Sequence, residues 1–87
     1  MFYIACIIED TKNKYYYYNF GTWCFYNEQH KIDRAICNKT YHDAQELLDK
    51  LYQNYSLYSL ILNKNNRMFC YIGFDNSLVT ISIKSLQ

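Results

Sequence analysis

Glycine and proline are almost missing from this 87-residue chain, which has no proline and only two glycines, Gly21 and Gly73. Loops that cradle phosphate or stabilise an oxyanion bring backbone N–H groups close to the ligand, and they are commonly rich in glycine. Two isolated glycines do not provide a loop of either kind. The sequence therefore offers no nucleotide-binding loop and no oxyanion loop.

Strong charge of either sign is missing as well. Nine Lys and Arg residues stand against eight Asp and Glu, a net charge of +1. That balance gives no electrostatic attraction to nucleic acid or to a membrane, and it rules out an acidic DNA mimic. No apolar run approaches the roughly 20 residues of a membrane span, and the run 2–8 lacks the basic flank of a signal peptide. We expect a cytoplasmic protein, in the host cell if a phage encodes it, with no membrane partner.

Metal-ligand spacing is the third absence. The four cysteines show no C-x-x-C pair, and His30 and His42 stand in no ligand-like spacing with them. Without a secretory signal, we expect Cys6, Cys24, Cys37 and Cys70 to be reduced thiols. A nucleophilic Cys–His pair can form in space, but nothing in the sequence indicates one. We expect no metal, no cofactor, no catalytic residues and no enzymatic activity.

Aromatic residues are what the chain has in abundance, with eleven tyrosines and five phenylalanines. About half of the residues are Phe, Tyr, Met, Ile, Asn or Lys, which AT-rich codons encode, while Gly, Ala, Arg and Pro are scarce. This composition indicates an AT-rich genome. Each tyrosine must therefore be judged by its position in the chain.

A single helix is predicted over 40–55. Thr40 can serve as the N-cap, and seven apolar residues then recur at helical spacing along one face. We expect Leu47, Leu48 and Leu51 on that face to be core residues. The apolar residues are Tyr41, Ala44, Leu47, Leu48, Leu51, Tyr52 and Tyr55.

The remaining segments alternate or are apolar throughout, which is typical of strands. We predict a single α+β domain spanning 1–87, with a mostly antiparallel sheet of five to six strands packed on the one helix, in the order β-β-β-(β)-α-β-β-β. Residues 32–37 are ambiguous and are interpreted as a short strand. The predicted strands are 2–9, 14–20, 22–27, 57–63, 67–73 and 77–84.

One helix cannot cover such a sheet. Fifteen helical residues make a rod about 22 Å long and 10 Å wide, whereas six strands span about 29 Å. Several strands are nevertheless apolar on both faces. Either the sheet curls around the helix as a partial barrel, or an aromatic face is left for a partner or for a second copy of the chain, as a homodimer.

The N-terminal hairpin is our candidate binding surface. Four consecutive tyrosines, 15–18, point alternately to both faces of their strand, so one helix cannot cover them all. The predicted partner-binding residues are Lys14, Tyr16, Tyr18, Trp23 and Tyr26. Small size, surplus aromatic surface and no catalytic constellation indicate a phage or mobile-element protein that binds and inhibits a larger host protein. Anti-CRISPR inhibitors of bacterial defence share this profile, with no shared motif.

A second function remains open. The string 67–74 resembles the RNP1 strand of RNA-recognition motifs at its basic Arg67, its aromatics Phe69 and Tyr71, and its final Phe74. It departs from that motif at Met68 and Cys70, and only 13 residues follow it, too few to complete that fold. The alternative is a single-stranded nucleic-acid-binding protein that stacks bases on Phe69 and Tyr71 beside Arg67. The scattered basic residues favour it less.

Overall fold

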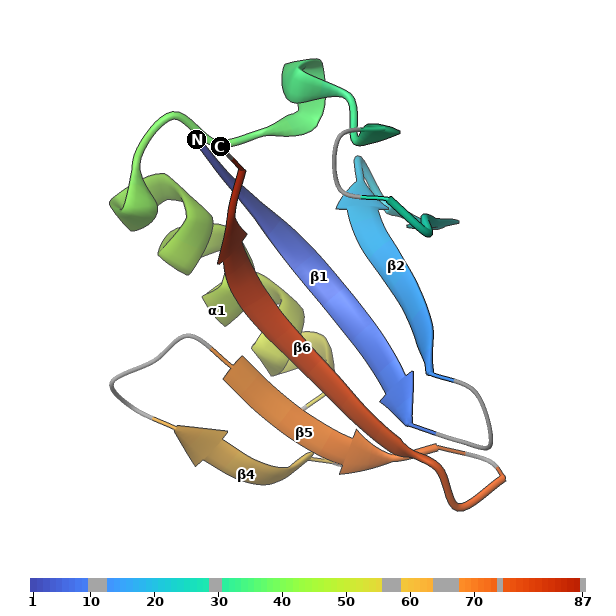
Figure 1. Cartoon of the computed structure of the whole chain (residues 1–87). Helices are drawn as coiled ribbons and strands as arrows, with labels where there is room; N and C mark the ends of the chain where they lie inside the picture. The colour runs from blue at the N-terminus through green and yellow to red at the C-terminus, as the bar shows by residue number, and fades with distance from the viewer. Residues whose placement is uncertain (10–12, 29–30, 56–58, 64–67, 74, 87) are drawn as a thin grey trace.

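Six antiparallel strands form one sheet, and a helix lies against one of its faces (Figure 1). The computed structural model describes residues 1–9, 13–28, 31–55, 59–63, 68–73 and 75–86. The strand order is β3-β2-β1-β6-β5-β4, so the predicted α+β fold is confirmed. The elements are β1 (Phe2–Glu9), β2 (Lys14–Asn19), β3 (Thr22–Phe25), α1 (Tyr41–Tyr55), β4 (Ser59–Asn63), β5 (Met68–Ile72) and β6 (Leu78–Ser85).

The first and last strands pair at the centre of the sheet. β1 and β6 are joined over their full lengths, from Phe2 opposite Ser85 to Glu9 opposite Leu78, and the two chain ends lie close together (Figure 1). β1 is buried on both faces, as expected of a central strand, and its nearly continuous apolar sequence suits that position. Its even-numbered residues face α1 and its odd-numbered residues face the other side.

Helix α1 forms as the sequence predicts. The Asp43 N–H donates to Thr40 Oγ1 at 3.1 Å, which confirms Thr40 as the cap. Leu48 and Leu51 are buried and Leu47 is half-buried, so only two of the three expected core leucines are fully inside. The main core between α1 and the sheet consists of Ile4, Cys6, Ala44, Leu48, Leu51, Phe69, Val79, Ile81 and Ile83.

The opposite face of the sheet has its own small cover, and here the predicted strand over 32–37 is wrong. Arg34–Ile36 is a short 3₁₀ helix, because the Asp33 carboxylate accepts a hydrogen bond from the Ala35 N–H at 2.9 Å and turns the chain. Sheet pairing is limited to one bridge, between Phe2 and Asn38. Ile32, only 4% exposed, packs in a second core with Tyr3, Ala5 and Leu86.

The β2–β3 hairpin turns through two residues, both in the left-handed region. Phe20 has φ 45° and Gly21 has φ 97°, and Asn19 pairs with Thr22 across the turn. This is the pattern of a type I′ turn, in which glycine and asparagine are the favoured residues. Gly21 fits that pattern, whereas Phe20 is strained there.

The sheet is open, since β3 and β4 lie at opposite ends of the strand order (Figure 1). The described strands therefore do not close into a complete barrel. Residues 10–12 and 64–66, between predicted strands, fall outside the described residues, as do Arg67 and Phe74.

Candidate functional site

The helix-facing side of the β2–β3 hairpin carries four aromatic rings in two pairs. Tyr18 and Trp23 meet edge to face with centroids 5.2 Å apart, and Tyr16 meets Phe25 in the same way at 5.9 Å. Both pairs follow the strand register, in which Tyr18 lies opposite Trp23 and Tyr16 opposite Phe25. The structure thereby settles which parity of the tyrosine run faces the helix side.

Helix α1 does not cover this aromatic face, which lies to one side of the helix. The helix packs mainly across β1 and β6 at the centre of the sheet, and Tyr16, Tyr18 and Trp23 are only half-buried against the edge of the main core. Phe25 is 62% exposed and Phe20, at the tip of the hairpin, is 85% exposed. We call Tyr16, Tyr18, Phe20, Trp23 and Phe25 the hairpin aromatic surface.

Phe20 combines two features that disfavour the folded monomer. Its backbone has a φ of 45°, in a region that L-residues other than Gly, Asn and Asp rarely occupy. Its ring is also left almost entirely in water. Neither the backbone strain nor the exposed ring stabilises the folded monomer. Backbone strain of this kind is typical of functional sites such as ligand clamps and switch regions.

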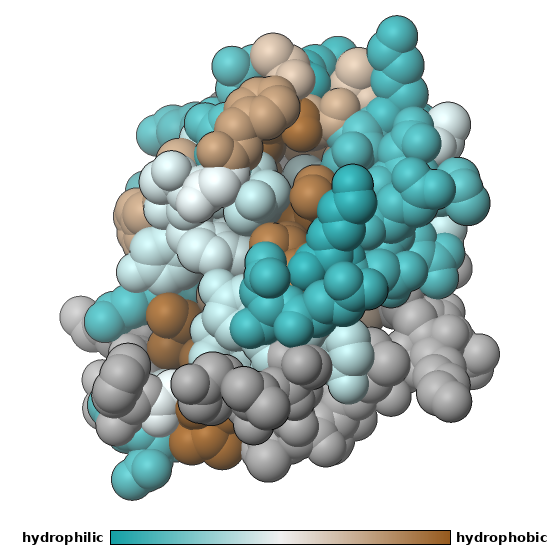
Figure 2. Space-filling view, turned by 180° about the vertical axis from the view of Figure 1, so that it is seen from behind, coloured by the Kyte–Doolittle hydropathy of each residue, from teal (hydrophilic) through white to brown (hydrophobic). Residues whose placement is uncertain are grey.

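Beyond Lys14, its first residue, the β2–β3 hairpin has no charged side chain. From Tyr15 to Asn27, thirteen consecutive residues lack Asp, Glu, Lys and Arg. Figure 2 looks onto the helix side and shows the hydrophilic outer surface of α1 beside a paler, weakly polar band over β2 and β3, with hydrophobic patches in the furrow between them. This surface has the character of a protein contact core, where charged residues are depleted and Tyr, Trp and Phe are enriched.

The furrow between α1 and β2 is hollowed at both ends. Near the hairpin tip, a hollow of about 250 Å³ is bordered by Tyr18, Phe20 and Leu47. At the other end, a larger hollow of about 850 Å³ is bordered by Tyr16, Tyr55 and Tyr71. The two hollows thus meet the hairpin aromatic surface through different residues of β2.

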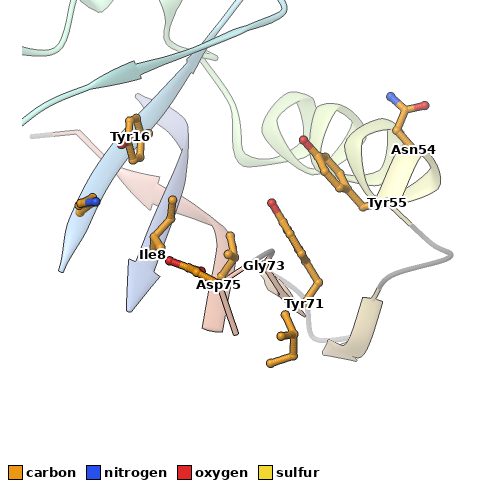
Figure 3. A pocket seen from close by; sticks show the side chains of 10 residues that line it. Ile8, Tyr16, Asn54, Tyr55, Tyr71, Gly73 and Asp75 are labelled. Carbon is orange, nitrogen blue, oxygen red and sulfur yellow. The ribbon is translucent and has the colours of Figure 1, made fainter. Parts of the chain in front are cut away.

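Figure 3 shows the larger hollow, with Tyr55 and Tyr71 side by side on one wall and Tyr16 across from them. The Tyr55 and Tyr71 rings stack with centroids 5.2 Å apart and planes 16° from parallel. Burial, with smaller contributions from Cys6 and Tyr55, raises the pKa of the Tyr71 phenol to about 12. The phenol therefore stays neutral at physiological pH.

Two charged side chains, Lys14 and Asp75, border this hollow. Hydrogen bonds from the Ser77 side chain and from the Ser77 N–H hold the pKa of the Asp75 carboxyl below its usual value, and the Lys14 ammonium lowers it a little further. Lys14, which the sequence analysis included in the binding set, thus lies at the rim of the hollow rather than among the exposed rings.

The structure does not bring Tyr26 together with the other predicted contact residues. Tyr26 lies on the opposite face of the sheet, with its ring 6.2 Å from Tyr3 and 6.0 Å from Tyr17. Burial and a hydrogen bond with Tyr3 raise the pKa of its phenol. Tyr26 therefore packs against the second core and is separated from Tyr16, Tyr18 and Trp23 by the sheet itself.

Of the two aromatic residues in the nucleic-acid alternative, Phe69 is not accessible for stacking a base. Phe69 is completely buried, with Tyr52 and Tyr55 from α1 packed over it at 5.4 and 5.8 Å. A base cannot reach a ring in that position. Tyr71 is half-buried against Tyr55, and Arg67 lies outside the described residues.

Cysteine thiols and metal-ligating side chains are the other candidate chemical groups of the described residues. All four cysteines are free thiols, and burial raises the pKa of the Cys6 thiol to about 11, which disfavours the reactive thiolate. No cluster of three or more metal-ligating side chains occurs in the described part of the chain. His42 forms an exposed ion pair with Glu46 at 3.0 Å. Among the described helices, none is long and apolar enough to cross a membrane.

Phe20 and Phe25 are the residues that sequence reasoning missed. The signal was present in the pattern Asn19-Phe20-Gly21-Thr22, because a two-residue turn there exposes its first central residue. That turn also fixes the pairing of Tyr16 with Phe25, which places Phe25 on the aromatic side. Strand periodicity alone does not define this turn, and it leaves the register of the hairpin open.

No protein-family model, no curated protein and no solved structure matches this chain.

Proposed function

We propose that this chain is a non-enzymatic binding protein that inhibits a larger host protein, and that the hairpin aromatic surface is its contact. The observation that carries the proposal is the exposure of Phe20 and Phe25 on a hairpin that α1 does not cover and that has no charged residue from Tyr15 to Asn27. Interface anchors are commonly large, rigid aromatic side chains, and each contributes about 2 kcal/mol or more at a binding hot spot.

The same observation favours a protein partner over nucleic acid. Nucleic-acid affinity depends on Lys and Arg side chains that neutralise phosphates, and the hairpin has none between Tyr15 and Asn27. Rings without neighbouring cations suit an apolar protein surface. Lys14 and Asp75, at the rim of the larger hollow, provide the polar boundary that sets orientation more than affinity.

The inhibitory role is supported by what the chain offers. The described residues carry no metal cluster, and the contact of His42 with Glu46 is exposed on α1 away from the hollows. A protein of 87 residues that binds through an aromatic contact surface can inhibit its target most simply by blocking an active site or a binding site of that target. A phage or mobile-element origin, with a host defence protein as the target, is the setting that the AT-rich composition favours.

The test is capture of the partner from the native host after nuclease treatment, with the bound proteins identified by mass spectrometry. The wild type is compared with a double variant, Phe20→Ala with Phe25→Ala, which removes the two exposed rings. Tyr15→Ala is the matched control, because Tyr15 lies in the same hairpin but points to the opposite face of the sheet. All variants are first checked for an unchanged melting curve.

We expect one protein that the wild type and Tyr15→Ala retain and that the double variant loses, with affinity reduced about 100-fold or more. Retention should change little between about 0.1 and 0.5 M salt, whereas a phosphate-dependent complex would weaken steeply over that range. Equal retention by the double variant, or retention that disappears with nuclease treatment, contradicts the proposal.

A further inference from the structure

The outer edge of β3 is an unpaired sheet edge with an unusual lack of protection. β3 ends the strand order, and no strand in the described part of the chain pairs with its outer side. Natural proteins guard such edges with charged side chains, proline or bulges. β3 is short, at four residues, but Thr22, Trp23, Cys24 and Phe25 include no charge and no proline, and the pairing with β2 shows no bulge.

The hydrogen-bond alternation shows which backbone groups face outward. The Tyr26 N–H donates to the Tyr15 carbonyl at 3.0 Å, so these two residues form a hydrogen-bonded pair with β2. In an antiparallel ladder, hydrogen-bonded pairs alternate with non-hydrogen-bonded pairs. The next hydrogen-bonded pair along the ladder is therefore Cys24 with Tyr17. The N–H and C=O groups of Trp23 and Phe25 therefore point away from β2, to the open edge.

The geometry points to a second copy of this chain as the occupant of that edge, in an antiparallel β3–β3 pairing with a two-fold axis at Cys24. Around that axis, Trp23 of each copy stands opposite Phe25 of the other. The outward groups of the two residues then exchange four hydrogen bonds, two for each pair. The two six-stranded sheets become one continuous sheet of twelve strands.

Side-chain chemistry favours a second copy over an unrelated strand. Only Cys24, on the two-fold axis, meets itself, but a charge on a neighbouring residue of the strand would also lie close to the same charge on the other copy. The hairpin has no charge from Tyr15 to Asn27, which removes that penalty. Phe25, 62% exposed in the monomer, gains Trp23 of the other copy as a cross-strand partner. Aromatic cross-strand pairs are among the favourable ones in sheets.

The pairing also places the two Cys24 thiols together, which gives it a specific signature. Cys24 occupies a non-hydrogen-bonded position across the axis, where Cα atoms are about 4.5 Å apart. That separation lies within the range of about 4.4–6.8 Å that a disulfide needs. In the reduced protein Cys24 is a free, half-buried thiol. This inference does not depend on the proposed host partner, and its test uses the purified protein alone.

The first measurement is sedimentation equilibrium of the reduced protein from about 10 µM to 1 mM, because a four-residue edge contact belongs to the weak, reversible class. We expect a dimer that increases with concentration. Phe25→Pro removes one outward donor from each copy, and thus two of the four hydrogen bonds, while it spares the bonds to β2. It should weaken dimerisation roughly 30-fold relative to Phe25→Ala, which loses the same ring but keeps the N–H.

The second measurement is crosslinking with copper phenanthroline, in which oxygen removes two electrons and two protons from a pair of thiols. Wild type and Cys37→Ser should give a disulfide dimer, and Cys24→Ser should give none while it still associates in reducing solution. This result decides the question even if Phe25→Pro does not fold.

A charge exchange tests the register. Cys24→Lys and Cys24→Glu should each be monomeric alone, because like charges meet at the axis, and their mixture should form a heterodimer at least as tight as the wild-type dimer. A monomer at every concentration, crosslinking through Cys37 in place of Cys24, or a mixture that stays monomeric overturns the inference.

Discussion

Replacing Leu48 with alanine should remove a large part of the stability of this domain. Leu48 is 2% exposed, in the core that also contains Ile4 and Ile81. The change deletes three heavy atoms, at about 0.8 kcal/mol for each buried methylene, and it leaves a cavity that the rigid sheet cannot close. We expect a loss of about 3 kcal/mol. Domains of this length have a free energy of unfolding of roughly 4–13 kcal/mol.

Leu47→Ala is the matched control for Leu48→Ala. Both changes act on neighbouring residues of α1 and alter helix propensity equally. Leu47, however, is half-buried and borders the open hollow near Phe20, so its loss creates no closed cavity. We expect about 1 kcal/mol for Leu47→Ala.

The assay is urea unfolding followed by far-ultraviolet circular dichroism, with the free energy of unfolding extrapolated to water. Thermal melting provides a second readout, in which Leu48→Ala should lower the melting temperature by more than about 10 °C. If Leu47→Ala costs as much as Leu48→Ala, the orientation of α1 on the sheet is not the one described here, and the position of the furrow beside it fails too.

Three further predictions concern single positions. Phe20→Asn should raise the stability of the free protein by about 0.5–1 kcal/mol in a thermal melt while it weakens partner capture, because asparagine tolerates the φ of 45° that strains phenylalanine. Ser82→Ala should be neutral or stabilising in urea unfolding, since the buried Ser82 Oγ has no hydrogen-bond partner among the described residues. Because the pKa of the Tyr71 phenol is raised to about 12, the folded state holds that proton more tightly than the unfolded chain, whose phenols ionise near pH 10. Stability should therefore fall as the pH rises from about 10 to 12, and Tyr71→Phe should reduce that slope in denaturation series matched for pH.

The architecture was within reach of sequence reasoning because its signals are local. The cap at Thr40 and the apolar spacing of Leu48 and Leu51 define α1 without knowledge of the rest of the fold. Strand periodicity likewise located all six strands of the sheet to within a few residues at each end. The pairing of β1 with β6 joins the two ends of the chain, and no local pattern indicates it.

The errors have physical causes that lie outside local pattern. Residues 32–37 have strand-like composition, but the Asp33 carboxylate satisfies the Ala35 N–H and favours a 3₁₀ turn. That turn lets Ile32 pack against Tyr3 and Ala5 on the second face of the sheet. The sequence did not predict that this segment would cover that face.

The candidate site was predictable only in part. That the hairpin would present aromatic rings followed from the tyrosine run, but the parity of the run depends on how β2 pairs with β1, from Ala5 opposite Tyr17 to Ile8 opposite Lys14. The same register places Tyr26 on the far face and leaves Phe25 exposed on the near one. The exposure of a side chain on β2 or β3 depends on where α1 packs on the sheet, and the sequence of a single strand does not determine that.

Cross-saturation NMR of the isotope-labelled chain, bound to the host protein that it captures, tests the central claim most directly. Irradiation of the unlabelled partner reduces the amide signals of residues that touch it. We predict the largest losses between Tyr16 and Phe25, with Tyr15→Ala leaving the pattern unchanged. Losses centred on the outer side of α1, or on the face that carries Tyr3 and Tyr26, would show that the hairpin aromatic surface is not the contact.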